Sequence, residues 1–70
     1  MNWIDTPESS NITGFGYNEA GQILTVAFKS GGEYQYFDVP QVVFEQMQAA
    51  ASKGQFLAQN IKGHYRYARV

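Results

Sequence analysis

The chain has 70 residues, a formal net charge of −1 and no cysteine. A chain of this length makes one small domain and buries only about 60% of the surface that it exposes when unfolded. The absence of cysteine excludes disulfides, thiolate nucleophiles and the common zinc sites. Because small domains usually need a staple or a partner, we expect self-association, as a homodimer or a higher homo-oligomer.

Charge and hydropathy restrict the location and the ligand. The opening MNWIDTPESSN lacks the basic and apolar regions of a secretion signal, and no segment approaches the roughly 20 apolar residues of a membrane span. We therefore expect a cytoplasmic protein without a membrane partner. Five Lys and Arg residues stand against six Asp and Glu residues, whereas dedicated binders of long RNA or DNA are normally basic.

Three segments from residue 12 onward alternate apolar with other side chains, as strands do: ITGFGY, QILTVAFK and EYQYFD. NEAG and SGG separate them, which predicts a three-stranded antiparallel meander, with Gly31 or Gly32 as the left-handed residue of the second hairpin. Closing the hairpins on Tyr17 with Gln22 and on Lys29 with Glu33 gives the pairs Phe15 with Leu24, Phe28 with Tyr34, Val26 with Tyr36 and Leu24 with Asp38. The predicted core face then carries Phe15, Leu24, Val26, Phe28, Tyr34 and Tyr36.

The opposite face of this meander is also apolar, since it carries Ile12, Gly14, Gly16, Ile23, Ala27 and Phe37. Residues 1–11 are polar apart from Trp3 and Ile4, which predicts an N-terminal arm before a single domain over residues 12–70. An apolar face that spans several strands needs a cover. We expect either the Trp3 arm or a second subunit to pack on it, and we favour the second subunit.

Two helices are expected after the sheet. In DVPQVVFEQMQAAASKG, Asp38 can cap the helix, Pro40 fits its first turn and Gly54 can end it. Its apolar stripe is Val43, Met47 and Ala50, with Phe44 and Ala51 beside it. A second short helix over QFLAQNI directs Phe56, Leu57 and Ile61 inward, and a final strand or extended tail follows. The predicted fold class is α+β, with both helices on one face of the sheet.

The pattern lacks the residues that catalysis needs. His64 is the single histidine, the serines lie in polar turns without a G-x-S-x-G elbow, and the six acids form no convergent pair. SGG has neither the strand-to-helix context nor the lysine of a phosphate loop. We therefore expect a non-enzymatic protein with no catalytic residue, no metal site and no cofactor.

The C-terminal stretch NIKGHYRYARV concentrates cations and aromatic residues. In an extended chain Tyr65, Tyr67 and Arg69 share one side, while His64 and Arg66 share the other. Tyrosine rings can stack on a base, and cations can form charge-assisted hydrogen bonds to a phosphate. Alternatively, the tyrosines cover the edge of the core and the cations protect an edge strand from aggregation. The sequence leaves both interpretations open.

Several pieces of the chain together resemble a known family: SSNI, GY, SGGEYQYFDVP, AASKGQF and NIKGHYRY. The most specific are Tyr34-x-Tyr36 with Val39-Pro40, and the turn from Ser52 to Gly54 that leads to Ile61, Lys62 and Tyr65. From about Ser9 to Val70 the chain is similar to the KTSC domain, a short module that resembles the C-terminal extension of some lysyl-tRNA synthetases and also occurs alone. The resemblance implies an α+β fold and RNA binding, with no reaction or cofactor. Ala58 stands where the family often has Asn.

Three hypotheses about function follow. The first is a module that binds a small nucleotide-like, phosphate-bearing ligand and holds or sequesters it. Its candidate ligand-binding residues are Lys62, Tyr65, Arg66, Tyr67 and Arg69, followed by Ser52, Lys53, Asn60 and His64. The second is an RNA-binding accessory domain whose partner is the end of an RNA. The third is a protein–protein interaction module that acts through the apolar second face of the sheet.

Overall fold

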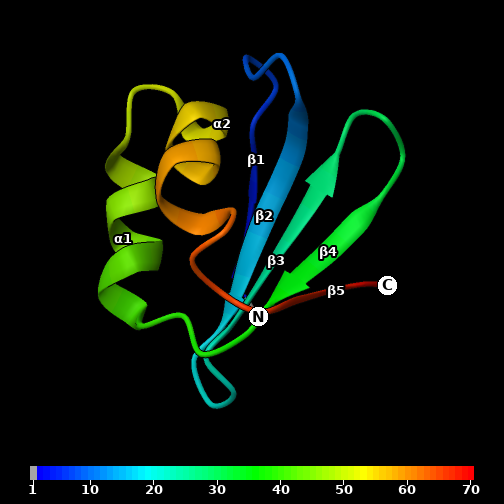
Figure 1. The fold of residues 1–70 in the computed structure, drawn as a ribbon. Coiled ribbons are helices and arrows are strands. Elements are labelled where there is room, and N and C mark those ends of the chain that lie inside the picture. Colours follow the sequence, from blue (N-terminus) through cyan, green and yellow to red (C-terminus); the bar gives the residue numbers. More distant parts are fainter. Residues whose placement is uncertain (1) are drawn as a thin grey trace.

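A computed structural model describes residues 2–70 as one antiparallel sheet with helices on one side. The strands, in the order β1-β2-β3-β4-β5, are β1 (Asn2–Asp5), β2 (Ile12–Asn18), β3 (Ile23–Phe28), β4 (Glu33–Tyr36) and β5 (Tyr67–Arg69). Between β4 and β5 come α1 (Gln41–Ala49), α2 (Lys53–Phe56) and the π-helix η1 (Leu57–Ile61). These helices cover one face of the sheet (Figure 1). The predicted α+β class is confirmed.

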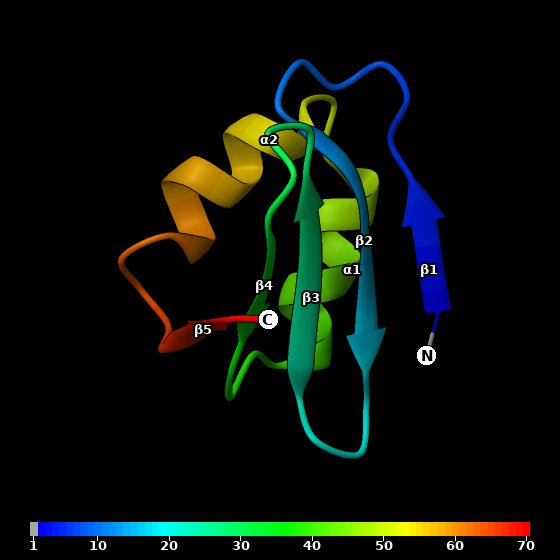
Figure 2. The ribbon, with the colours of Figure 1, turned by 90° about the vertical axis from the view of Figure 1, so that its right-hand side faces the viewer.

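The number of strands differs from the prediction, because both ends of the chain join the sheet. Residues 2–5 pair antiparallel with β2, with Trp3 opposite Gly16 and Ile4 opposite Phe15. Ile4 packs against the core, but a strand of four residues with two apolar side chains is too short for periodicity to reveal. At the other end the last residues form a strand, with Tyr67 opposite Tyr36. β1 and β5 lie at opposite edges of the sheet (Figure 2).

Both predicted hairpin registers are wrong by two residues. At the first turn, the side-chain oxygen of Asn18 accepts hydrogen bonds from the backbone N–H of Ala20 and of Gly21, and Gln22 adopts a positive φ of 54°. This turn brings Tyr17 opposite Leu24 and Phe15 opposite Val26.

At the second turn, Gly31 takes the left-handed conformation that the sequence predicted for one of the two glycines, with a φ of 105°. The backbone N–H of Phe28 donates to the carbonyl oxygen of Gly32 at 2.8 Å, so the loop closes one residue earlier on each strand than predicted. Val26 then lies opposite Tyr34, and Leu24 opposite Tyr36. Because side chains alternate, a shift of two leaves the paired core residues Phe15, Leu24, Val26, Tyr34 and Tyr36 on their predicted face.

A β-bulge corrects the prediction for Ile12. The β2–β3 register breaks between Ile12 and Gly14, so Thr13 is an extra residue in the strand. Ile12 therefore turns to the face beneath the helices, where it is fully buried, and does not lie on the opposite face.

Trp3 covers part of that opposite face. A Cβ added at Gly14 would lie 2.8 Å from Nε1 of Trp3, so the indole rests directly on the glycine. The same Nε1 donates a hydrogen bond to Oδ1 of Asp5 at 3.2 Å. The β1 segment thus contributes to the cover that the sequence required, at the β1–β2 side of the sheet.

The boundaries of α1 differ from those predicted. Asp38 is not the cap: it has a φ of 59°, and the N-cap is Pro40, without a side-chain hydrogen bond. The helix ends at Ala49, because Ser52 starts a new one by accepting a hydrogen bond at Oγ from the backbone N–H of Gln55 at 3.3 Å. Gly54 consequently lies inside α2 and does not end α1.

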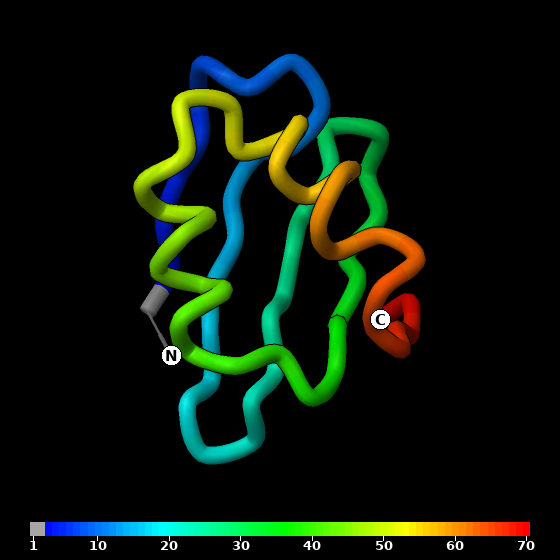
Figure 3. The backbone as a smooth tube through the Cα atoms, turned by 60° about the vertical axis from the view of Figure 1, so that its left-hand side comes forward, coloured from blue at the N-terminus to red at the C-terminus, as the bar shows by residue number. Residues whose placement is uncertain are grey.

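The core lies between the sheet and the three helical segments. Its fully buried side chains are Ile12, Phe15, Leu24, Val26, Val39, Met47, Leu57 and Ile61. The inward direction of Leu57 and Ile61 is confirmed, while Phe56 is half-buried. In Figure 3, α1 lies over the β1–β2 side, and α2 with η1 lies over the β3–β4 side. Within residues 2–70, none of the helices has the length and apolar character to cross a lipid bilayer.

Candidate functional site

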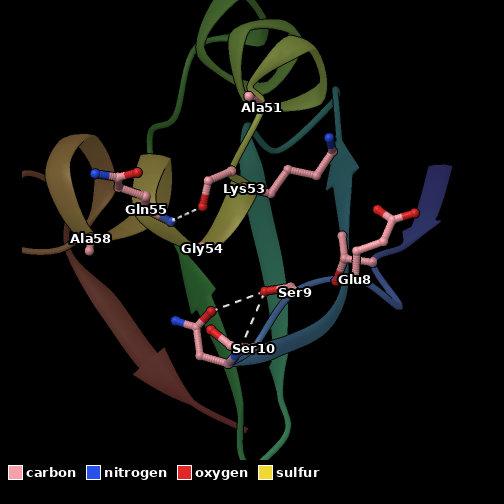
Figure 4. Close-up of a pocket in the computed structure, with 11 residues that line it drawn as sticks. Glu8, Ser9, Ser10, Ala51, Lys53, Gly54, Gln55 and Ala58 are labelled. Atoms are coloured by element: carbon pink, nitrogen blue, oxygen red, sulfur yellow. Dashed lines mark hydrogen bonds between the residues drawn. The ribbon is translucent and has the colours of Figure 1, made fainter.

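The residues that the sequence singled out divide among separate hollows of the surface. Ser52 and Lys53 line a hollow of about 550 Å³ between the loop at residues 6–11 and the start of α2 (Figure 4), which we call the loop hollow. Several of its polar groups are engaged locally: Ser52 caps α2, Nζ of Lys53 donates to the carbonyl oxygen of Ala50 at 3.0 Å, and Oγ of Ser9 donates to Oδ1 of Asn11 at 3.0 Å. These bonds hold the loop and the helix in place, so we assign the loop hollow a structural role.

A second cavity, also of about 550 Å³, has a different chemistry. It is lined by Phe28, Ser30, Tyr34, Tyr36, Lys62, Gly63 and Tyr67, and we call it the aromatic cavity. Its side chains come from the end of β3, from β4, from the turn after η1 and from β5. The alternation of β4 places Tyr34 and Tyr36 on one face, and the β4–β5 register places Tyr67 directly opposite Tyr36.

The rings of the aromatic cavity are close enough to form one surface. The centroid of Tyr67 lies 5.7 Å from that of Tyr34 and 5.8 Å from that of Tyr36. Phe28 meets Tyr34 edge to face, with centroids 5.4 Å apart and an interplanar angle of 89°. These distances fall in the range at which aromatic pairs attract each other. The ring of Tyr67 is tilted by 50° to that of Tyr34 and by 38° to that of Tyr36, so a flat ring could stack on one of these rings while the others border it.

Tyr36 gives this wall a polar group. Its side chain is only 3% exposed, and the hydrogen bonds found among residues 2–70 do not include its hydroxyl. In that part of the chain no buried polar side-chain atom lacks a partner, so the hydroxyl keeps some contact with solvent, and Tyr36 is one of the residues that line the cavity. Burial, followed by the neighbouring phenols of Tyr34 and Tyr67, raises the pKa of Tyr36 above its ordinary value of about 10. A phenol is protonated at neutral pH in any case, so the hydroxyl can donate, and the raised pKa extends this state to higher pH.

Two cations stand at the margin of the aromatic cavity. Nζ of Lys62 lies 5.2 Å from the ring centroid of Phe28, a cation–π contact. A Cβ added at Gly32 would lie 3.3 Å from the ring of Tyr34 and 3.6 Å from Nε of Arg69, which places this guanidinium beside the Tyr34 end of the cavity. The cavity is thus bordered by positive charge at two places.

A third hollow, of about 490 Å³, adjoins the second. Its lining is Phe37, Gly63, His64, Tyr65, Arg66 and Tyr67, and we call it the C-terminal hollow. Arg66 makes two exposed contacts here: its Nη2 lies 3.3 Å from Oδ2 of Asp38, and its guanidinium lies 5.6 Å from the ring centroid of Phe37. Tyr65 is half-buried and packs against the core.

The structure therefore brings only part of the predicted set together. Lys62 and Tyr67 line the aromatic cavity, with Arg69 at its margin. His64, Tyr65 and Arg66 join Tyr67 in the C-terminal hollow, and Ser52 and Lys53 lie in the loop hollow. Nδ2 of Asn60 donates to the carbonyl oxygen of Phe56 at 3.3 Å, within the helical segment.

Five lining residues are missing from the predicted set: Ser30, Gly63 and the three aromatic residues Phe28, Tyr34 and Tyr36. The three aromatic residues carry the chemistry of the cavity. The sequence placed them correctly on the face that meets the helices. It could not show that α2 and η1 leave this end of the face open. The signal that was available is the density of aromatic residues at one end of that face, where a core would more often alternate them with aliphatic side chains. Within residues 2–70 no group of three or more His, Asp or Glu side chains could hold a metal ion.

Comparisons with known proteins are consistent with this architecture and concern nearly the whole chain. Residues 8–65 match the KTSC domain family. A lysine–tRNA ligase of Nostoc sp. is 42% identical over 64 residues, which cover 91% of this chain but only 11% of the ligase. A protein of Tsukamurella paurometabola is 42% identical over 59 residues, covering 84% of this chain and 88% of its own.

A solved structure is similar throughout. The crystal structure of a KTSC domain protein from Yersinia pestis superposes with a TM-score of 0.89 at 31% identity, and the match covers 99% of both chains. The family match over residues 8–65 includes α1, α2 and η1 as well as β2, β3 and β4, and it shows that the chain belongs to the KTSC domain family.

Proposed function

We propose that this protein is a non-enzymatic module that binds a small nucleotide-like, phosphate-bearing ligand in the aromatic cavity, and that it holds or sequesters this ligand in the cytoplasm. One observation carries the proposal: four aromatic rings and a lysine line a single cavity of about 550 Å³. That volume lies in the range of small-molecule sites, about 300–1,000 Å³.

Each group of the cavity has a role in this proposal. The exposed ring of Tyr67 stacks against a base, an interaction worth about 1–3 kcal/mol per base, and the ring of Tyr34, tilted by 50° to it, borders the base. The hydroxyl of Tyr36 donates a hydrogen bond to the edge of that base, which adds selectivity. Lys62 leaves the ring of Phe28 for the phosphate, since a charge-assisted hydrogen bond is stronger than an exposed cation–π contact.

The scarcity of cations favours a small ligand. The whole chain carries five Lys and Arg residues. One of them, Arg66, already contacts Asp38, and another, Lys53, donates to a backbone carbonyl in the loop hollow. Two cations border the aromatic cavity, and they could neutralise one or two phosphates but not a long backbone.

A second candidate is the end of an RNA. The name of the lysine–tRNA ligase relative includes an RNA, although this chain spans about a ninth of that protein. The same cavity could take a terminal nucleotide, with the rest of the RNA outside it. The two candidates differ in salt dependence, because affinity for a longer RNA falls steeply as salt is raised.

Isothermal titration calorimetry against nucleoside monophosphates, nucleoside diphosphates and adenosine-diphosphate-ribose tests the proposal. We expect Lys62→Ala to weaken binding of the best ligand about tenfold, the loss of one charge-assisted contact. Lys53→Ala is the matched control, because it removes the same charge from the loop hollow, and its affinity should equal that of the original chain. Equal losses in the two variants, or no binding by any of these compounds, would refute the proposal. An affinity that grows with RNA length would instead favour the second candidate, an RNA end bound in the same cavity.

A further inference from the structure

The aromatic cavity and the C-terminal hollow are neighbours with a common wall. Tyr67 and Gly63 line both of them. Tyr67 is 61% exposed although it belongs to a strand, which fits a ring that stands between two open spaces. Gly63 has a φ of 81°, and this left-handed residue turns the chain between Lys62, on one side, and His64, on the other.

Each side of Tyr67 has its own aromatic lining. Toward the aromatic cavity its neighbours are Tyr34 and Tyr36, with ring centroids 5.7 Å and 5.8 Å away and ring planes tilted by 50° and 38°. On the other side the lining includes Phe37 and Tyr65. The two spaces measure about 550 Å³ and about 490 Å³, so they are of comparable size. The arrangement could hold one flat ring on each side of Tyr67.

The cations are divided in the same way. Lys62 borders the aromatic cavity, and Arg66 borders the C-terminal hollow. Arg66 contacts Asp38 at 3.3 Å and lies 5.6 Å from the ring centroid of Phe37, and 78% of its side chain is exposed, so a ligand in the C-terminal hollow can reach its guanidinium. One cation on each side suits a ligand whose two rings are joined through phosphate.

We propose that the site takes two linked nucleotides, with one base in the aromatic cavity, the other in the C-terminal hollow and the ring of Tyr67 between them. This inference rests on the proposed function and specifies its ligand as a dinucleotide unit. A ring between two bases occupies one stacking step of about 3.4 Å, and proteins that insert side chains between base steps show that a phosphodiester link can span the opening. The unit could be a free dinucleotide or the last two residues of an RNA.

The test compares 5′-phosphorylated ribodinucleotides with the matching nucleoside monophosphates by isothermal titration calorimetry. We expect the best dinucleotide to bind at least about tenfold tighter than either of its monophosphates, since the second base adds a stacking contact. Equal affinity for the dinucleotide and one monophosphate would overturn this inference and leave the proposed function standing. If neither class binds, both fail.

Two variants distinguish binding from a structural effect. Arg66→Ala should abolish the advantage of the dinucleotide while the affinity for a monophosphate in the aromatic cavity stays unchanged. Asp38→Asn breaks the same ion pair but keeps Arg66, and Asn tolerates the left-handed backbone of this position, so it should retain the advantage. A loss of the advantage in both variants, or in neither, would contradict the assignment of Arg66 to the second nucleotide.

A third arm separates the two sources of the ligand. An oligoribonucleotide that ends in the preferred dinucleotide is titrated beside the free dinucleotide at two salt concentrations. Equal affinity assigns the site to a free dinucleotide, and tighter, salt-sensitive binding assigns it to an RNA end. Both results are consistent with two occupied spaces. An affinity for the oligonucleotide that does not depend on the identity of its last two residues would contradict them.

Discussion

Gly54 packs against Asn11 so closely that no side chain fits at this position. A Cβ added there would overlap Oδ1 of Asn11 and lie 3.0 Å from its Cγ. Asn11 cannot move freely, since its Oδ1 accepts a hydrogen bond from Oγ of Ser9. The contact ties the loop at residues 6–11 to the first turn of α2 and explains a glycine inside a helix, where it is otherwise unfavourable by about 1 kcal/mol.

We predict that Gly54→Ala lowers the free energy of unfolding by about 1–2 kcal/mol, because the overlap outweighs the better helix propensity of alanine. Urea unfolding followed by circular dichroism measures the change. In an Asn11→Ala background the overlap is gone, so the same Gly54→Ala substitution should be neutral or stabilising. An equal cost in both backgrounds would show that Asn11 is not the cause.

For Tyr34 and Tyr36, the sequence predicted the correct face of the sheet but not their place in the lining of a cavity. Alternation along β4 assigned Tyr34 and Tyr36 to the correct face, since that depends only on neighbouring residues. Whether this face is closed depends on where α2 and η1 pass over the sheet, which local patterns do not contain. The candidate site could therefore be predicted for Lys62 and Tyr67 but not for its full lining.

At the scale of elements, the four-residue strand β1 covers part of the second sheet face through the side chain of Trp3. Trp3 lies on Gly14 with 45% of its surface exposed, whereas Val42, on the outside of α1, is 55% exposed. The two side chains have similar exposure but different surroundings, because the indole closes part of the second sheet face.

We predict that Trp3→Ala lowers the free energy of unfolding by about 1–2 kcal/mol, roughly half the cost of removing a fully buried large side chain. Val42→Ala is the control and should change stability by less than about 0.5 kcal/mol. Thermal unfolding by circular dichroism measures both, because the first variant has no tryptophan fluorescence. If the two variants are equally stable, the contact of Trp3 with Gly14 contributes nothing.

The elements themselves were largely predictable, and their ends were not. The alternating segments and the helical periodicity identified β2, β3, β4, α1 and the second helix. The first turn is set by the side chain of Asn18, which bonds the backbone of Ala20 and Gly21, and by the positive φ of Gln22. Asp38 likewise adopts a positive φ, so α1 begins after it, with Pro40 as its N-cap. These non-glycine residues with positive φ are uncommon, and local rules therefore assign the turn and the cap to the wrong residue.

At the scale of the whole molecule, two tyrosines connect stability to alkaline pH. Burial is the main cause that raises the pKa of both Tyr17 and Tyr36, and the further causes are Glu19 for Tyr17, and Tyr34 and Tyr67 for Tyr36. A raised pKa in the folded state means that folding favours the protonated phenol. This contribution is fully present below the unfolded value of about 10 and is lost as pH rises through the folded values.

We predict that the urea midpoint falls as pH is raised above about 10, and that Tyr36→Phe makes this fall shallower because one of the two groups no longer titrates. Tyr36 is the better position for the test, since the hydroxyl of Tyr17 donates to the carbonyl oxygen of Val39 and its removal would also cost a hydrogen bond. Deprotonation of lysines affects the original chain and the variant alike. Parallel curves for the two proteins would contradict the prediction.

The position of the helices between β4 and β5 has a consequence for the interpretation of variants. The other neighbouring strands are joined by a turn or a loop, whereas the two strands that supply Tyr34, Tyr36 and Tyr67 are connected through α1, α2 and η1. The distance between the two walls of the aromatic cavity therefore depends on how well a remote layer is packed. A substitution at Met47, a fully buried residue of α1, could open the cavity without touching any group in it. A variant that loses binding therefore identifies a contact with the ligand only when its folding has been measured as well.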